Sequence, residues 1–276
     1  GIDALKRRMA EVLEPLAHEP PLAADLIKPK DLVMLVVPID LAAPKGRLIL
    51  PQVQVLREVL DAGAMALTVK ESEVTDMLRG LAAKPALVIT DSQAVREVAA
   101  AVPEDIRLTT FSTLFARYKG DFAAQLAGAA AIDTLKDGDR VLIAEGCSHH
   151  VTCDDIGRVK IPNWMKKYTG RELKFEWTQG ADFPDNLEDY ALVVHCGGCM
   201  LNRAEVRRRI NECARQGVKV TNYGIVISKM QGVLERVVKG IADAGATGSV
   251  SDTGSISDTG SISDTGSISD TGEEGD

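Results

Sequence analysis

Apolar residues recur along this chain in two spacings, one typical of buried strands and one typical of amphipathic helices. From about residue 31, short apolar runs alternate with segments whose apolar positions lie three and four apart. The runs predict strands at 32–39, 64–69, 85–90 and 106–110, and the segments between them predict helices at 52–62, 72–82 and 93–100. Because strands that alternate with helices favour a parallel sheet, residues 31–119 are expected to form one α/β domain.

The same alternation continues in a second unit, residues 120–246. A helix is expected at 121–135, followed by strands at 140–145, 173–177, 191–194 and 218–221. Asn202 and Glu205 are spaced like a helix N-cap and its reciprocal partner, and Gly217 is expected to end that helix. The predicted fold class is therefore α/β, with two consecutive domains whose sheets are mainly parallel.

The two ends of the chain differ from these units. Residues 1–30 open with one amphipathic helix, which Pro20 and Pro21 interrupt. From Ser249 the hexapeptide Ser-Ile-Ser-Asp-Thr-Gly, with Val250 in the first copy, occurs four times. One aliphatic residue per hexapeptide cannot bury a core, so residues 247–276 are expected to form a flexible acidic tail.

Composition narrows the classes of function. A formal net charge of -8 gives no electrostatic support for binding nucleic acid or an anionic membrane. No apolar run approaches the roughly 20 residues of a membrane span, and no leader is recognisable, so a cytoplasmic location is expected. Lys45-Gly46-Arg47 lacks the features of a phosphate-binding loop, and no other stretch supplies one. No phosphate-binding loop is therefore expected, and residues 31–119 are interpreted as a unit for packing or self-association.

Two clusters of cysteine and histidine carry the chemistry of the sequence. Cys147-Ser148-His149 and His195-Cys196-Gly197-Gly198-Cys199 each follow a run expected to form a buried strand. Such strands usually lie side by side in a parallel sheet, and ligands collect beyond their carboxyl ends. The three thiols are therefore expected to converge. They suit zinc or an iron-sulfur cluster, and a redox-active Cys196–Cys199 pair is a third interpretation.

Each neighbouring polar residue also has a structural interpretation. His149 and His195 can donate hydrogen bonds instead of binding metal, and Asp154 and Asp155 can cap the turn that follows. Cys153 is interpreted as a spare thiol. No role is assigned to the two remaining histidines, His18 and His150.

The helix expected after the second cluster carries several arginines and one more cysteine. Cys213 shares a face with apolar positions and is expected in the core. A solvated helix face is the default interpretation of Arg203, Arg207, Arg208 and Arg209. The sharper hypothesis is that Arg203, the nearest to the cysteine cluster, helps to hold an anionic metal cargo through charge-assisted hydrogen bonds.

The spacing of the two clusters, together with several longer stretches, resembles one known family. The pattern is Cys-x-His, then 45 residues, then His-Cys-x-x-Cys. The further stretches are Pro38–Leu41, Ala43–Gln52, Thr90–Ala94, Phe115–Asp121 and Asp154–Pro162. Over roughly residues 1–240 the sequence is similar to HydF, the scaffold family of FeFe-hydrogenase maturation.

This resemblance implies three parts: a GTP-binding domain, a dimerisation domain and a domain that holds a 4Fe-4S cluster. Residues 1–30 resemble only the closing helix of the GTP-binding domain and its linker, so GTP is not expected to bind here. Residues 31–119 correspond to the dimerisation domain and residues 120–246 to the cluster domain. The tail has no counterpart in the family.

The resemblance also implies the ligands and the role of the cluster. Cys147, Cys196 and Cys199 would bind three irons, which leaves one iron with an exchangeable position. The candidates to occupy that position, or to give way to cargo, are His149, His195, Asp154 and Cys153. A homodimeric, non-catalytic scaffold is implied, which receives a diiron precursor from two radical enzymes and carries it to apo-FeFe-hydrogenase.

Overall fold

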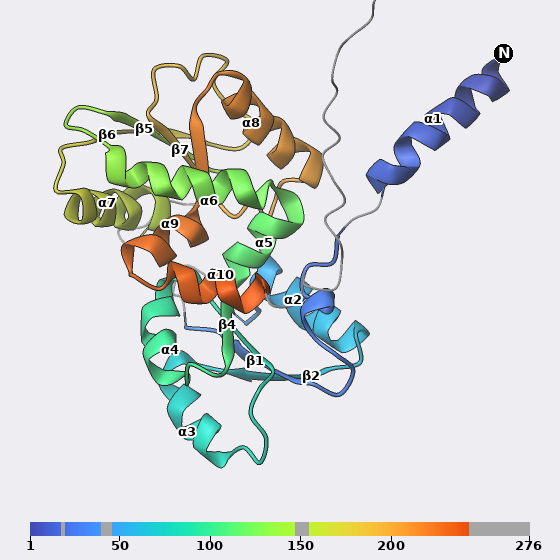
Figure 1. Cartoon of the computed structure of the whole chain (residues 1–276), viewed down its shortest axis with the longest axis vertical. Helices are drawn as coiled ribbons and strands as arrows, with labels where there is room; N and C mark the ends of the chain where they lie inside the picture. Colours follow the sequence, from blue (N-terminus) through green and yellow to red (C-terminus); the bar gives the residue numbers. More distant parts are fainter. Residues whose placement is uncertain (18–19, 40–45, 147–154, 243–276) are drawn as a thin grey trace, which may run out of the picture. The chain divides into compact units, whose positions relative to one another are not determined.

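The computed structural model describes residues 1–17, 20–39, 46–146 and 155–242, and within them the chain forms two α/β units after a first helix, α1 (Ile2–Ala17) (Figure 1). The predicted fold class is confirmed. The predicted cluster residues Cys147 and His149, and also Cys153 and Asp154, lie outside these ranges, as does the repetitive tail.

The first unit contains a four-stranded parallel sheet in the order β2-β1-β3-β4. Its strands are β1 (Leu32–Val36), β2 (Met65–Val69), β3 (Leu87–Thr90) and β4 (Arg107–Thr110). Helices α2 (Leu50–Asp61), α3 (Val74–Gly80) and α4 (Val95–Ala101) connect them, and α5 (Phe111–Lys119) follows β4 directly. β1 and β3 are buried over most or all of their length, which explains why their sequences are continuously apolar.

The second unit repeats this topology, with the order β6-β5-β7-β8 and all strands parallel. Its strands are β5 (Arg140–Ala144), β6 (Lys174–Thr178), β7 (Leu192–His195) and β8 (Lys219–Asn222). Its helices are α6 (Phe122–Ala130), α7 (Ile161–Thr169), α8 (Arg203–Arg215) and α9 (Tyr223–Met230), with a π-helical turn, η5 (Ile156–Lys160), before α7. Helix α10 (Leu234–Ala242) follows α9 in the chain. In both units the first strand lies between the second and the third, so each sheet has a switch point where crossover connections leave in opposite directions.

The two units pack through equivalent helices. Thr110 ends β4 and caps α5 through its hydroxyl, and Asn222 ends β8 and caps α9 through its side-chain oxygen. The Asn222 amide also donates to the Ser112 carbonyl at 3.0 Å. A Cβ atom at Gly224 would lie 2.4 Å from Ser112 Cβ, so only glycine permits this approach of α9 to α5. The carboxyl edges of the two sheets are thereby held opposite each other.

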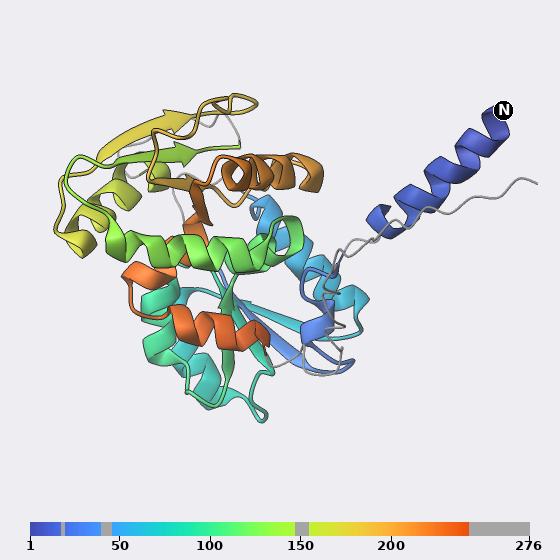
Figure 2. The same ribbon diagram turned by 45° about the horizontal axis from the view of Figure 1, so that its top comes forward.

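The last described helix returns to the first sheet. Figures 1 and 2 show α10 beside β4, and Ile241 joins the core formed by β1, β3 and α5. A Cβ atom at Gly240 would lie 2.1 Å from the Leu108 carbonyl oxygen, which shows how closely the two backbones approach. The sequence prediction assigned residues 234–242 to the second unit, because they follow it in the chain and no local pattern shows their contact with β4.

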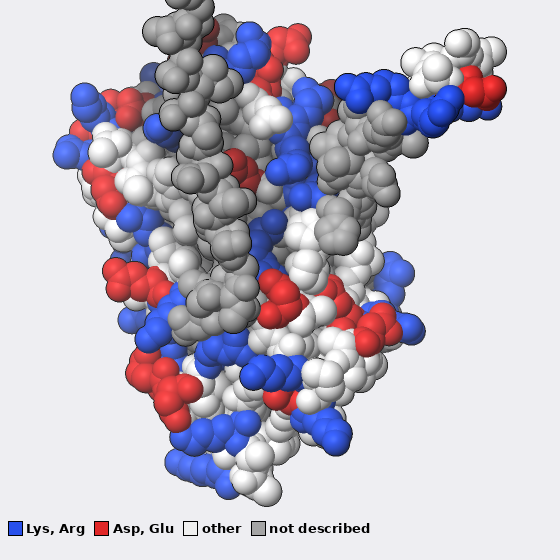
Figure 3. Space-filling view, turned by 45° about the vertical axis from the view of Figure 1, so that its right-hand side comes forward, with Lys and Arg blue, Asp and Glu red and all other residues white. Residues whose placement is uncertain are grey.

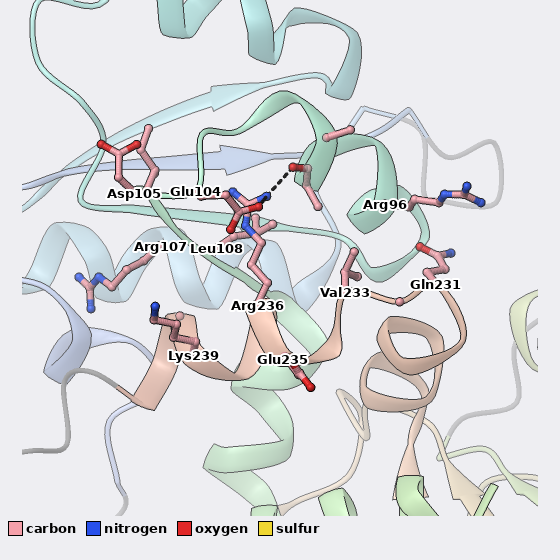
Figure 4. A pocket seen from close by; sticks show the side chains of 15 residues that line it. Arg96, Glu104, Asp105, Arg107, Leu108, Gln231, Val233, Glu235, Arg236 and Lys239 are labelled. Atoms are coloured by element: carbon pink, nitrogen blue, oxygen red, sulfur yellow. Dashed lines mark hydrogen bonds and ion pairs between the residues drawn. The ribbon is translucent and has the colours of Figure 1, made fainter. Parts of the chain in front are cut away.

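Arg236 fastens α10 to the end of α4 (Figure 4). Its guanidinium donates to the carbonyls of Ala99, Val102 and Pro103, and it pairs with Glu104 at 3.1 Å. The last carbonyls of a helix have no partner within the helix, so Arg236 satisfies groups that α4 leaves open.

Charged side chains of both signs are interspersed over the described part of the face in Figure 3. Several form exposed ion pairs, such as Arg57 with Asp61 and Arg79 with Asp76. Pairs of this kind contribute little to stability. None of the helices in the described ranges has the length and apolar character needed to cross a membrane.

The Arg236→Met variant is expected to lower the free energy of unfolding by about 1–3 kcal/mol, because it leaves the partly buried carbonyls of Ala99 and Val102 without their donor. Urea denaturation followed by circular dichroism measures this change. The control is Lys239→Met, at an exposed position of the same helix. Equal stability of the two variants would contradict the fastening role.

Candidate metal centre

The strands that precede the two predicted clusters are neighbours, as expected. β5 pairs with β7 at the switch point of the second sheet, with Ala144 opposite His195. The Cys196 amide donates to the Ala144 carbonyl at 2.9 Å, and the Gly146 amide donates to Cys196 Sγ at 3.0 Å. Gly146 immediately precedes Cys147 in the sequence. The described chain therefore brings the backbone next to the first cluster into contact with a thiol of the second.

The loop of residues 196–201, called the cysteine loop here, directs backbone amides at the Cys196 sulfur. Besides the Gly146 amide, the Gly198 amide donates to Cys196 Sγ at 3.4 Å. Gly198 has a φ of +61°, in the left-handed region that favours glycine. At Gly146 a Cβ atom would lie 2.8 Å from Leu201 Cγ, so a larger residue there would displace the Leu201 side chain. Two backbone amides directed at one sulfur favour its thiolate form.

Burial opposes the charged form of both cysteines of this loop. It is the main cause that raises the pKa of Cys196, and the two backbone hydrogen bonds offset part of the rise. Burial also raises the pKa of Cys199, followed by the nearby Cys196 sulfur, whereas Lys119 lowers it. Both thiols are therefore expected to hold their protons until a metal displaces them.

His195 is buried at the end of β7 with both ring nitrogens occupied by the protein. Because Arg209 can only donate, Nε2 accepts from it at 3.5 Å, and Nδ1–H donates to the Cys196 carbonyl at 2.7 Å. Burial lowers the pKa of His195 to about 4, so the ring is neutral. This arrangement favours the interpretation that His195 supports the loop by hydrogen bonding over the one in which it binds metal.

Arg209 is fully buried, which corrects the expectation that it belongs to a solvated face. It faces His195, pairs with Glu205 at 2.8 Å, donates to the Gly180 carbonyl and stacks over the Phe183 ring. The sequence spacing indicates this burial, because Arg209 lies three residues after Val206 and four before Cys213, on the buried side of α8.

The predicted cap of α8 is confirmed in part. The Asn202 side-chain oxygen accepts from the Glu205 amide at 2.8 Å, as an N-cap does. The Glu205 carboxylate, expected to bond back to Asn202, is instead held by Arg208 and Arg209, and the hydrogen bond from Arg208 is the main cause that lowers its pKa to about 2. Gly217 ends the helix with a φ of +72°. Cys213 is buried in the core, as predicted.

Lys119, which sequence reasoning did not single out, holds the cysteine loop from the first unit. It lies in the last turn of α5, is 7% exposed, and its Nζ donates to the carbonyls of Gly198, Cys199 and Leu201 at 2.7, 3.2 and 2.7 Å. A buried ammonium group is tolerated only where it is well hydrogen-bonded. The only indication in the sequence that Lys119 matters is its place in the family-like stretch Phe115–Asp121. No local pattern can show its contact with Gly198, 79 residues later.

Glu145, the residue before Gly146, is buried and bonded to polar side chains from η5 and α9. Glu145 is 1% exposed, pairs with Arg158 at 3.3 Å and accepts from the Tyr223 hydroxyl at 3.4 Å. A Cβ atom at Gly157 would lie 2.1 Å from that hydroxyl. Asp155 caps the η5 turn by accepting from the Arg158 amide, which confirms the structural interpretation of this residue.

Two of the three predicted thiol ligands, Cys196 and Cys199, share one described loop. Within the described ranges, no three His, Cys, Asp or Glu side chains lie close enough together to hold a metal ion. The donor set nevertheless fits a thiolate-bound metal, because two reduced thiols lie on one loop and backbone amides point at one of them. Arg203 is half-buried at the start of α8, and its predicted contact with cargo stays a prediction.

The Lys119→Met variant is expected to loosen this loop, because three carbonyls lose a common donor. Amide hydrogen exchange of residues 198–201 in the metal-free chain should accelerate, with a loss of about 1–3 kcal/mol in local stability. Lys84→Met, at an exposed ion pair with Asp105, is the control. Unchanged exchange at 198–201 would show that Lys119 does not position the loop.

Comparisons with known proteins agree with two adjacent units. The family model described as the hydrogen maturase F dimerization domain matches residues 22–120. The model described as the hydrogen maturase F tetramerization domain matches residues 123–240. Among curated proteins, none matches the sequence at a significant level.

Two solved structures are similar only at a low level. One is an NtrC family transcriptional regulator from Clostridium acetobutylicum, with 12% identity, coverage of 75% of this chain and 97% of that chain, and a TM-score of 0.23. The other is a putative LacI family transcription repressor from Corynebacterium glutamicum, with 11% identity, coverage of 77% and 91%, and a TM-score of 0.25. At these scores neither supports an argument about fold or function.

Proposed function

Because this chain belongs to the HydF family of hydrogenase maturation proteins, we propose that it is an iron-sulfur scaffold that binds a 4Fe-4S cluster through Cys147, Cys196 and Cys199. The observation that carries this proposal is the 3.0 Å contact between the Gly146 amide and Cys196 Sγ. It joins the backbone beside one predicted ligand to the sulfur of another, at the switch point where ligands bind in parallel sheets.

The chemistry of the loop supports a metal over a dithiol exchange reaction. A reactive Cys-x-x-Cys pair needs a thiol whose pKa is lowered, often by the start of a helix. Here burial raises the pKa of both cysteines, and α8 begins only at Arg203, four residues after Cys199. Buried thiols that accept backbone N–H bonds suit a bound cluster, whose sulfur ligands are commonly hydrogen-bonded in this way.

The role proposed for the cluster is to hold cargo. With three protein thiolates on four irons, a bound cluster supplies one iron whose remaining coordination can exchange. His149 and Asp154 stay candidates for that position, while His195 is proposed to support the loop from behind. The cargo is proposed to be a diiron precursor, received from the two radical enzymes of the maturation pathway and delivered to apo-FeFe-hydrogenase.

The proposal also includes the oligomeric state of the chain and its lack of a catalytic role. Both matching family models are named for assembly, one for dimers and one for tetramers of hydrogen maturase F. We therefore propose that the chain forms a homodimer through its first unit, in the cytoplasm. The two models cover the described units, and neither is a nucleotide-binding domain, so a scaffold without GTP hydrolysis is proposed for this sequence.

The Cys196→Ser and Cys199→Ser variants are each expected to lose most of the iron and sulfide after anaerobic reconstitution, because a serine hydroxyl is a poor ligand for iron at neutral pH. Metal analysis and electron paramagnetic resonance measure the loss. Cys213→Ala, at a buried cysteine outside the loop, is the control and should keep the complement of the unmodified chain.

Other outcomes of that experiment would identify the alternatives. A colourless protein with stoichiometric zinc would contradict the scaffold and indicate a zinc-stabilised interaction protein. A metal-free protein with a reversible Cys196–Cys199 disulfide would indicate a dithiol oxidoreductase. Full iron and sulfide in both loop variants would remove the ligand assignment.

A further inference from the structure

In each sheet a helix covers one of the two edge strands. Gly240 brings α10 against β4, and Gly128 brings α6 against β8, where a Cβ atom would lie 1.9 Å from the Val220 carbonyl oxygen. The other edge strand of the second sheet is β6, which lies beyond β5 in Figure 1. Among the described strands, β5 alone is hydrogen-bonded to it. An open edge presents N–H and C=O groups that a further strand can bind.

The main-chain groups of Phe175 and Trp177 point away from β5. The Lys174 amide donates to the Asp139 carbonyl at 2.9 Å, and the Thr178 carbonyl accepts from the Glu145 amide at 3.0 Å. Because the direction of the hydrogen bonds alternates along a strand, residues 174, 176 and 178 bond to β5. Phe175 and Trp177 therefore offer their N–H and C=O groups to a strand on the open side.

The side chains of these two residues form an aromatic surface beside the open edge. Their ring centroids are 6.4 Å apart, and Trp177 is 38% exposed although its Nε1 donates to the Gly157 carbonyl. Phe175 is half-buried and packs against the same core cluster as Trp164, the second of the two tryptophans in the chain. Aromatic residues are enriched at protein interfaces, so their presence here favours a protein partner.

The charges of β6 are complementary to those of a second β6 strand. Two antiparallel copies that meet about a two-fold axis at Phe175 place Lys174 opposite Glu176 of the second copy, once on each side of the axis. Lys174 is exposed and has no ion-pair partner among the described residues, and the Glu176 side chain stays 43% exposed beside Arg140. An axis at Glu176 would instead place two carboxylates opposite each other, which is destabilising. The charge pattern therefore favours a second copy in one register.

We propose that β6 is an interface between two copies of this chain, which pair antiparallel about a two-fold axis at Phe175 and join their four-stranded second sheets into one continuous sheet. The proposal rests on the self-association proposed above and adds a second contact to the one in the first unit. Because each copy contributes the same strand, the pairing covers both open edges and the assembly closes at this contact. It requires no cluster, so the metal-free chain is sufficient to test it.

The Lys174→Glu variant tests the charge pairing. In the full chain, reduced and metal-free, it should weaken association through β6 about tenfold or more, because each Lys–Glu pair becomes a pair of like charges. Sedimentation equilibrium over a range of protein concentrations measures the change. Lys219→Glu is the control, since it makes the same change of charge at the exposed first residue of β8, the edge strand that α6 covers. It should associate like the unmodified chain.

The measured masses distinguish this contact from the one in the first unit. A tetramer that Lys174→Glu reduces to a dimer supports both contacts, and a dimer that it dissociates supports β6 and contradicts the first-unit contact. An assembly that Lys174→Glu leaves unchanged, or that Lys219→Glu weakens equally, would overturn the β6 interface, as would an unmodified chain that stays monomeric. Iron content is measured on separate reconstituted samples, so that failure of the scaffold is recognised by itself.

A cross-link tests the register. Hydrogen-bonded residues directly opposite each other in antiparallel strands have Cα atoms about 5.5 Å apart, which a disulfide can span. On mild oxidation, Phe175→Cys should therefore form a disulfide between positions 175 of two copies, identified by mass spectrometry in a mixture of isotopically labelled and unlabelled chains. Lys219→Cys should form none between positions 219. A Phe175→Cys variant that associates like the unmodified chain without forming this disulfide would overturn the proposed pairing.

Discussion

A buried ammonium group from the first unit holds the cysteine loop of the second. Desolvating a lysine is costly, and Lys119 recovers that cost by donating to three carbonyls of one loop. The contact requires the end of α5 and residues 198–201 to be in place together. The candidate metal site therefore does not belong to either unit alone, because a lysine of the first unit holds the loop that carries Cys196 and Cys199 of the second.

Each ion pair near this loop has one fully buried partner. Glu145 is paired with Arg158, Arg209 with Glu205, and His195 is neutral between Arg209 and the Cys196 carbonyl. Buried ion pairs contribute little net stability, but removing one partner is strongly destabilising. These contacts restrict the conformations open to the loop, so the Cys196 and Cys199 sulfurs are held in place without a metal, while burial raises the pKa of both thiols.

Local signals in the sequence were sufficient for the strands and insufficient for the contacts between units. Continuous apolar runs predicted β1, β3, β5 and β7, and the rule that parallel neighbours share an edge brought Gly146 to Cys196. α5 and α9 were missed because Thr110 and Asn222 are both the last residue of a strand and the cap of the next helix, so no loop separates the elements. Lys119 and Arg209 were missed because their burial depends on partners distant in the sequence, and their side chains alone suggest solvent.

The return of α10 to β4 has a practical consequence for dividing the chain. Both family models suggest a cut near residue 120, between two consecutive modules. A fragment that stops there would lose the helix whose backbone lies against Leu108 and whose Ile241 fills the first core. It would present bare apolar surface to water, and its aggregation would say nothing about the intact protein. An excised first module needs residues 233–242 rejoined to it, as a graft or as a separate peptide.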